Sequence, residues 1–134
     1  MAHWLLKTEP GEYSFAKLVE EGKTTWNGVS NNLALQYMRQ MRKDELVLIY
    51  HTGEERQIVG IAQLTSNPYP DPYAKDGKRV VIDLRPVEAL ATPVTLAQIK
   101  ADPAFADFEL VRLGRLSVMP VSPERWKAIV ALGK

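Results

Sequence analysis

The sequence contains no cysteine and only two histidines, His3 and His51, among its 134 residues. Thiol catalysis, disulfide bonds and thiolate metal sites are therefore excluded, and two imidazoles cannot by themselves complete a multi-histidine metal centre. We accordingly expect neither a metal nor any other cofactor. The absence of cysteine also fits a protein that works in a reducing compartment.

An excess of charge of one sign and long apolar runs are absent as well. Seventeen Lys and Arg residues against sixteen Asp and Glu residues leave a formal net charge of +1, so no strong overall field attracts polyanions. Any affinity for nucleic acid must therefore come from a local site. No apolar run approaches the roughly 20 residues that cross a bilayer, and the apolar start is too short for a signal peptide. We expect a cytoplasmic protein with no membrane partner.

Composition and length indicate a single folded domain that spans residues 1–134. With 46% hydrophobic and 25% charged residues, the chain resembles average soluble proteins rather than disordered or membrane proteins. Runs rich in β-branched and other apolar residues predict strands at 4–7, 45–50, 57–64, 79–90 and 116–121, the fourth interrupted at Pro86. A short charged turn joins the second and third of these strands, which predicts an antiparallel hairpin.

Capping residues followed by apolar residues at helical spacing predict short helices between the strands. Polar residues at 23–32 and prolines at 66–73 predict loops, with a turn at 9–11. Strands at both ends of the chain and helices between them favour a mixed α+β sheet or a small barrel. The helices are expected between Ser14 and Gly22, from Leu33 to Met41 behind Asn31 or Asn32, at 95–100, and from Pro123 to Leu132 behind Ser122.

No catalytic constellation is recognisable in the sequence. The glycines form neither a phosphate-binding loop nor Gly-x-Gly-x-x-Gly, and no Gly-x-Ser-x-Gly elbow occurs. His51 has two interpretations, a general base beside Thr52 or a hydrogen-bonded histidine at the end of a strand. The adjacent pairs Glu20-Glu21 and Glu54-Glu55 are typical of solvated charge at segment ends. We therefore expect a protein that is not an enzyme.

Several polar and aromatic residues fall in the segments expected to be loops. An aromatic side chain outside regular structure either covers the core or stacks on a ligand, and Trp26 has both interpretations. Asn and Asp beside an aromatic plane are the groups that read the edge of a flat heterocycle. The residues concerned are Glu9, Tyr13, Trp26, Asn27, Ser30, Asn31, Tyr69, Asp71 and Tyr73.

Uncommon sequence words occur in a characteristic order along nearly the whole chain. They are His-Trp-Leu-Leu-Lys-Thr-Glu-Pro at 3–10, Tyr-Ser-Phe at 13–15, Trp-Asn-Gly-Val-Ser-Asn at 26–31, Tyr-His at 50–51, Val-Gly-Ile at 59–61, Tyr-Pro-Asp at 69–71 and Arg-Leu-Ser-Val at 115–118. With these words the sequence resembles the EVE domain family. The resemblance implies a PUA-like fold, which is a mixed, partly closed β-barrel of about five to six strands flanked by short helices.

The resemblance also implies a relationship to YTH domains, which hold a methylated adenine in an aromatic cage. By this resemblance the chain would bind a modified nucleobase, either cytosine or adenine, in DNA or RNA. Trp26 matches the family's pocket tryptophan, and Tyr69 and Asp71 lie in a loop expected to form the opposite wall. The other implied pocket residues are Lys7, Glu9 and Tyr13 after the first strand, and Asn27, Ser30 and Asn31 after the tryptophan.

Two positions depart from the family pattern. Ser30 stands where the family usually has arginine, so a guanidinium that would contact a phosphate is missing. Asn27 is often Asp in relatives, so a negative charge is missing beside the base. Cations that would contact phosphates in its place are Arg39, Arg42, Lys43, Lys78, Arg79 and Arg115, although solvated surface charge explains each of them equally well.

The expected mechanism is binding by a monomer, with a base turned out of its strand, stacked on Trp26 and enclosed by Tyr69. Any effector function would belong to a separate protein. An alternative is an enzyme acting on a nucleobase or small heterocycle, with Glu9 or Asp71 as general acid or base near His51. A third interpretation is a module that senses a small molecule in the same pocket.

Overall fold

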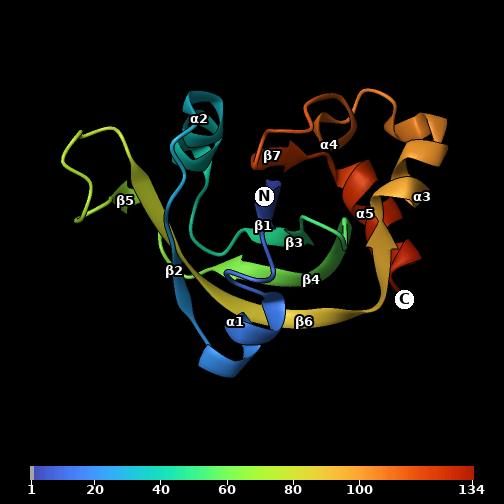
Figure 1. Ribbon diagram of the computed structural model, residues 1–134, viewed down its shortest axis with the longest axis horizontal. Coiled ribbons are helices and arrows are strands. Elements are labelled where there is room, and N and C mark those ends of the chain that lie inside the picture. The colour runs from blue at the N-terminus through green and yellow to red at the C-terminus, as the bar shows by residue number, and fades with distance from the viewer. Residues whose placement is uncertain (1) are drawn as a thin grey trace.

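The computed structural model describes residues 2–134, and Figure 1 shows a curled sheet surrounded by short helices. Its strands are β1 (His3–Thr8), β2 (Thr24–Trp26), β3 (Leu46–His51), β4 (Gln57–Leu64), β5 (Tyr69–Pro70), β6 (Val80–Thr95) and β7 (Val118–Val121). Six of them pair in the order β2, β6, β4, β3, β1, β7, and the short β5 pairs with β6. β1 and β3 are parallel, and the other pairs are antiparallel.

The helices begin where the sequence offers a capping side chain. Oxygens of Ser14, Asn31, Thr95 and Ser122 accept backbone N–H groups of the first turns, so the predicted caps are confirmed, with Asn31 rather than Asn32 at the second helix. None of the helices within residues 2–134 is long and apolar enough to cross a bilayer. The helices are α1 (Phe15–Glu21), α2 (Asn32–Gln40), α3 (Leu96–Ala101), the 3-10 helix η1 (Pro103–Phe105), α4 (Glu109–Arg112) and α5 (Pro123–Leu132).

The sheet is rolled into a partly closed barrel. α2 packs against both β6 and β7, although β4, β3 and β1 separate these two strands in the sheet. The sheet must therefore curve until α2 bridges its two sides. Register shifts in the β3–β4 and β4–β6 pairs mark bulges, which bend strands and increase their twist. This α+β, PUA-like half-barrel confirms the predicted fold class.

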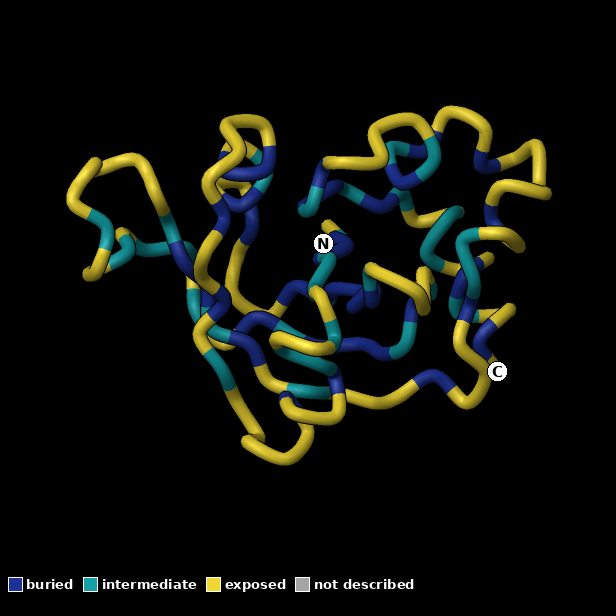
Figure 2. Tube along the Cα trace, viewed as in Figure 1, coloured by how far each residue is buried: buried dark blue, intermediate teal, exposed yellow. Residues whose placement is uncertain are grey.

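The core lies around the central strands, and dark blue, buried segments occupy the middle of Figure 2. β1, β3 and β4, at the centre of the strand order, are buried over much of their length. Phe15 of α1, Trp26 of β2 and Met38 of α2 belong to the same hydrophobic cluster. The segment between β1 and β3 is therefore anchored in the core at three places.

Two segments predicted to be loops contain short strands, so these predictions are wrong in part. β2 lies within 23–32 and β5 within 66–73, and both pair with the long β6. The local residues indicate turns, but the strand hydrogen bonds come from a partner far along the chain, which overrides local propensity. Proline is tolerated in β5 because an edge strand does not need a donor on its free side.

β6 is longer than the predicted strand at 79–90. It continues through Pro86 to Thr95, and Pro86 lies beside a register shift opposite β4, where the ladder is already interrupted. The sequence does not predict η1 or α4, because three or four residues carry too little periodicity. The other predicted strands and helices are confirmed to within a few residues.

Gly60 in β4 lies against the ring of Phe15. A Cβ atom at this position would be 2.5 Å from ring carbons of Phe15, so Gly60→Ala should lower the free energy of unfolding by about 1–3 kcal/mol through overpacking. Urea denaturation measures this loss. Gly114→Ala is the matched control, because its Cβ would meet no atom within 4 Å, and it should change stability by less than about 0.5 kcal/mol. Equal losses in both variants would contradict the close packing.

Candidate functional site

A cavity of about 700 Å³, hereafter the Trp26 cavity, opens between the end of β1, α1 and the chain that connects β2 to α2. Its volume falls within the range of about 300–1,000 Å³ that is typical of ligand pockets. The structure brings together seven of the nine base-contact residues that the sequence indicates. These are Lys7, Glu9, Tyr13, Trp26, Asn27, Ser30 and Asn31.

A tight turn after β1 forms the first wall of the Trp26 cavity. The N–H groups of Glu12 and Tyr13 each donate to the carbonyl of Glu9 at 2.9 Å. The Thr8 hydroxyl donates to the carbonyl of Tyr13 at 2.7 Å. The turn predicted at 9–11 is thereby confirmed, and it returns the chain so that Tyr13 lies beside the end of β1.

The second wall is held between a strand and a helix. β2 pairs with β6 and places Trp26 opposite Ile82. Gly28 then has φ of +80°, a conformation that glycine adopts without steric cost. At the end of the wall, the Asn31 side-chain oxygen accepts the N–H of Ala34 at 3.0 Å and starts α2.

Trp26 belongs both to the core and to the cavity wall. The residue is 8% exposed and part of the main hydrophobic cluster, yet it also lines the cavity. The Tyr13 ring meets it edge-on, with ring centroids 6.1 Å apart and an interplanar angle of 87°, an arrangement that aromatic pairs favour. The core interpretation of Trp26 is therefore confirmed, and packing fixes the ring. Stacking of a ligand on this ring stays a prediction.

Polar atoms around the aromatic pair are partly used by the fold and partly free. The Tyr13 hydroxyl donates to Glu21 Oε1 at 2.6 Å, and burial together with this hydrogen bond raises the pKa of Tyr13. Glu9 Oε1 accepts the N–H of Gly11 at 3.0 Å. Asn31 uses its side-chain oxygen for the helix cap, so its amide nitrogen remains a donor for a ligand.

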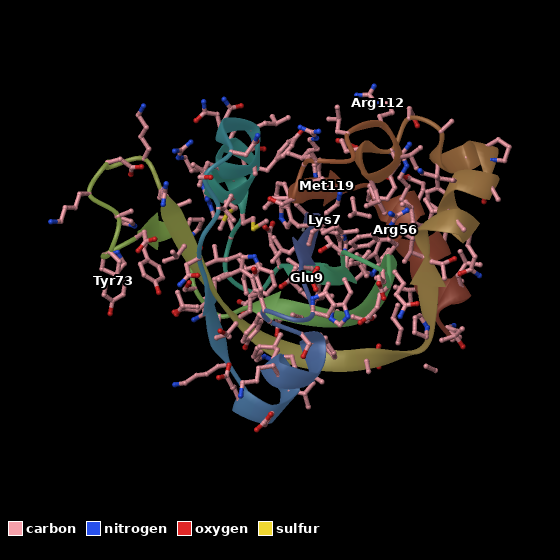
Figure 3. All side chains as sticks on the ribbon, viewed as in Figure 1. Lys7, Glu9, Arg56, Tyr73, Arg112 and Met119 are labelled. Carbon is pink, nitrogen blue, oxygen red and sulfur yellow. The ribbon has the colours of Figure 1, made fainter. Side chains whose placement is uncertain are left out.

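Lys7 lies at the end of β1, next to Glu9 in the middle of the view in Figure 3. Register places it beside Tyr50 of β3, and its ammonium nitrogen is 5.6 Å from the centroid of the Tyr50 ring. The same nitrogen donates to the carbonyl of Gly114 at 2.9 Å. Burial lowers the pKa of Lys7.

The charges that line the Trp26 cavity are mainly negative. Glu9, Glu12 and Glu21 provide carboxylates, whereas Lys7 provides the cation. Carboxylates accept hydrogen bonds from amino groups and repel phosphates. The cavity is therefore suited to a neutral, flat ligand that carries N–H donors.

Tyr69 does not form the opposite wall, contrary to the sequence-based prediction. It pairs with β6, and its hydroxyl donates to Asp83 Oδ1 at 2.7 Å. The Thr25 hydroxyl donates to the same oxygen at 2.9 Å. Thr25 lines the Trp26 cavity, but Tyr69 is not among the residues that line it.

Asp71 is also outside the cavity. Its carboxylate accepts the N–H of Tyr73 at 2.9 Å within the loop that follows β5. Figure 3 shows Tyr73 at the outer edge of the molecule, far from Lys7 and Glu9. The Tyr-Pro-Asp word therefore marks a structural turn on the outer side of β6.

Of the cations predicted to contact phosphates, Arg115 lies beside the site. It lines a second cavity of about 330 Å³ that shares Asn31 with the Trp26 cavity. Arg42 donates to the carbonyls of Arg39 in α2 and of Met41 just after it, and Arg79 pairs with Asp76 at 3.5 Å. These contacts favour a structural role for cations in this region. Those that line neither cavity are Arg39, Arg42, Lys43, Lys78 and Arg79.

His51 is a structural histidine at the end of β3. It is 7% exposed, its Nε2 accepts the N–H of Phe15 at 3.0 Å, and its Nδ1 lies 2.9 Å from the Glu55 carboxylate. The hydrogen bond to His51 is the main cause that lowers the pKa of Glu55. The strand-end interpretation of His51 is therefore confirmed, and neither ring nitrogen is free to act as a general base.

Sequence reasoning missed several residues of the Trp26 cavity. Glu12 and Glu21 supply two of its carboxylates, and Ser117 lines it from the segment before β7. The carbonyl of Ser117 accepts the N–H of Lys7 at 2.9 Å, so strand pairing brings it to the site. Glu12 in the turn before α1 and Glu21 at the end of α1 both have the appearance of solvated charge in the sequence.

Comparison with known proteins identifies the family. The family model described as EVE domain matches residues 2–132. This chain belongs to the EVE domain family. The NMR structure of Rpa0253 from Rhodopseudomonas palustris is 41% identical to this EVE domain, with a TM-score of 0.94 over 99% of this chain and 93% of that one. The resemblance indicated by the sequence words is confirmed.

A further relative comes from human, matched both by sequence and by structure. Thymocyte nuclear protein 1 is 25% identical to this EVE domain over 98% of this chain and 73% of its own length. The crystal structure of human THYN1 protein in complex with 5-methylcytosine containing DNA has a TM-score of 0.91 and 24% identity, and the match covers 100% of this chain and 98% of that one. At that identity the likeness establishes a common fold.

Lys7 should make the free energy of unfolding of this EVE domain depend on pH in the alkaline range. Burial lowers the pKa of Lys7 in the folded chain below 10.5, which is the value expected for Lys7 in the unfolded chain. Between the folded and unfolded pKa values the unfolded chain binds more protons, so stability rises with pH in that range. Lys7→Met removes this contribution. The free energy of unfolding of the variant minus that of the native chain should therefore fall as pH rises from 7 toward 10 in urea denaturation.

The control for this measurement is Lys127→Met, which changes an exposed lysine on α5. Its stability difference from the native chain should not vary over the same pH range. A constant difference for Lys7→Met would contradict the desolvation of Lys7.

Proposed function

We propose that this EVE domain recognises a modified nucleobase that is turned out of its strand into the Trp26 cavity, with 5-methylcytosine in DNA as the first candidate. The observation that carries the proposal is one cavity that combines a fixed aromatic platform with carboxylate and amide groups. The fold shared with human THYN1 protein, which is in complex with 5-methylcytosine containing DNA, supports the choice of ligand.

Trp26 provides the stacking platform in this proposal. Stacking of a base on an aromatic side chain contributes about 1–3 kcal/mol to binding. The core holds the indole from one side and the Tyr13 edge holds it from another, so the ring does not have to be ordered when the base arrives. A flat base then lies against the accessible part of Trp26.

The polar residues of the cavity complement the edge of cytosine. The Glu9 carboxylate accepts a hydrogen bond from the exocyclic amine, as acidic residues do from N4 of cytosine. The free amide nitrogen of Asn31 donates to a ring acceptor of the base. The carboxylates also repel phosphate, so the cavity admits the base and excludes the backbone.

We propose binding without turnover. The enzymatic alternative needs a general acid or base near the ligand. Of its three candidates, His51 is held by hydrogen bonds to the fold and Asp71 lies outside the cavity. Glu9 remains, without a second titratable partner from that set.

Trp26→Phe tests the platform. Phenylalanine keeps an aromatic ring in the core but offers less stacking surface, so affinity for a 5-methylcytosine strand should fall by about five- to tenfold, which corresponds to about 1 kcal/mol. Fluorescence anisotropy with modified and unmodified DNA and RNA strands measures the change, and circular dichroism checks the fold. Trp26→Ala is less suitable because truncation of a buried tryptophan costs about 3–5 kcal/mol of stability.

Trp126→Phe is the matched control, because Trp126 packs on His3 with ring centroids 4.4 Å apart and does not line the Trp26 cavity. Its affinity should equal that of the native chain. An unchanged affinity for Trp26→Phe would rule out stacking on this ring. Conversion of the base would favour the enzyme, and the absence of both modification-selective binding and turnover would favour a small-molecule module.

Ser30→Arg should restore the phosphate contact that this chain lacks relative to its family. Ser30 is exposed and lines the Trp26 cavity, so a guanidinium there can reach a flanking phosphate. Affinity should rise, and the slope of log affinity against log salt should steepen by about 0.7–0.9. The ratio of modified to unmodified binding should stay constant, because phosphate contacts do not read bases. Ser30→Gln, which adds length without charge, should leave the slope unchanged.

A further inference from the structure

A third cavity, hereafter the basic cavity, has a volume of about 290 Å³ and shares Lys7 with the Trp26 cavity. Its walls come from the end of β3, the turn after it, α3, α4 and Gly114. Three cations line it, Lys7, Arg56 and Lys100, and no Asp or Glu does. The charge of this cavity is therefore opposite to that of its neighbour.

The three cations have no carboxylate partner among residues 2–134, where no acidic oxygen lies within 4.0 Å of their charged nitrogens. Lys7 donates to the carbonyl of Gly114 at 2.9 Å, and Arg56 Nε donates to the carbonyl of Gly53 at 3.2 Å. Burial lowers the pKa of Lys7, whereas Arg56 and Lys100 are exposed at the rim of the cavity. An anion in the cavity would be attracted by all three cations and would offset the cost of burying the charge of Lys7.

The backbone holds Arg56 at the basic cavity. Its φ is +46°, which residues with a side chain adopt rarely. Its carbonyl accepts the N–H of Leu96 at 2.9 Å at the start of α3, so the turn and the helix are tied together there. Tyr50 also lines the cavity, and its hydroxyl adds a neutral donor to the three cations. The Thr52 hydroxyl donates instead to the carbonyl of Thr8 at 3.4 Å.

We infer that the basic cavity binds a phosphate group of the nucleic-acid strand whose base occupies the Trp26 cavity; this inference rests on the proposed function. Lys7 lines both cavities, so a base and a phosphate bound on its two sides are close neighbours along one strand. The base cavity is lined mainly by carboxylates and the phosphate cavity by cations, so charge favours the base in the first and the phosphate in the second. Phosphate contacts of this kind provide much of the affinity for nucleic acid.

The test measures affinity for an unmodified and a 5-methylcytosine strand over a series of potassium chloride concentrations. Lys100→Ala and Arg56→Asn should each flatten the slope of log affinity against log salt by about 0.7–0.9, as expected for one lost phosphate contact. Both strands should weaken by the same factor, because a backbone contact does not read bases. Asn is chosen at position 56 because it tolerates a positive φ.

Lys127→Ala is the matched control, since it removes an exposed cation of α5 that does not line the basic cavity. Its slope should equal that of the native chain. An equal change in all three variants would show a general surface effect and overturn the inference, and so would unchanged slopes for Lys100→Ala and Arg56→Asn. Because the slope is also measured on unmodified DNA, loss of methyl selectivity alone contradicts the proposed function and leaves the phosphate site intact.

Amide chemical shifts distinguish a strand phosphate from free phosphate. An unmodified oligonucleotide should shift the amide signals of Arg56 and Lys100 at concentrations where inorganic phosphate alone leaves them in place. If inorganic phosphate saturates these shifts and the oligonucleotide does not move them, the cavity binds a small anion and the inference is wrong.

Discussion

The parallel pairing of β1 with β3 determines where the site lies. Parallel neighbours cannot be joined by a hairpin and need a crossover of a dozen or more residues. In this chain the crossover covers 9–45 and carries α1, β2 and α2. Most of the wall of the Trp26 cavity is part of this crossover. The connection that the sheet topology requires is therefore also the connection that builds the site.

The sequence predicts features whose cause lies within a few residues. The helix caps at Ser14 and Asn31 are of this kind, because the capping oxygen and the N–H it accepts are three residues apart. β2 is not, because its hydrogen bonds come from β6. Tyr69 shows a second limit, since order along the chain does not tell which face of a strand a side chain occupies.

The net charge of the sequence does not predict how charge is distributed over the folded chain. A formal net charge of +1 predicts weak long-range attraction to polyanions, and the structure adds that this average conceals an acidic cavity and a basic one on either side of Lys7. Residue type alone predicts the cations that contact phosphates, and most of these cations lie at the end of α2 or in the loop after β5. Arg56 and Lys100 gain their position from the packing of α3 beside the turn after β3.

The burial of Trp26 has a consequence for the entropy of recognition. Ordering a side chain costs free energy, and in many complexes this cost falls on the binding step. Here the core immobilises the indole when the chain folds, so a ligand meets a surface that is already rigid. Because Trp26 belongs to both the core and the cavity wall, core packing also affects binding. A substitution in the core beside Trp26 that loosens the ring would weaken recognition without touching the ligand.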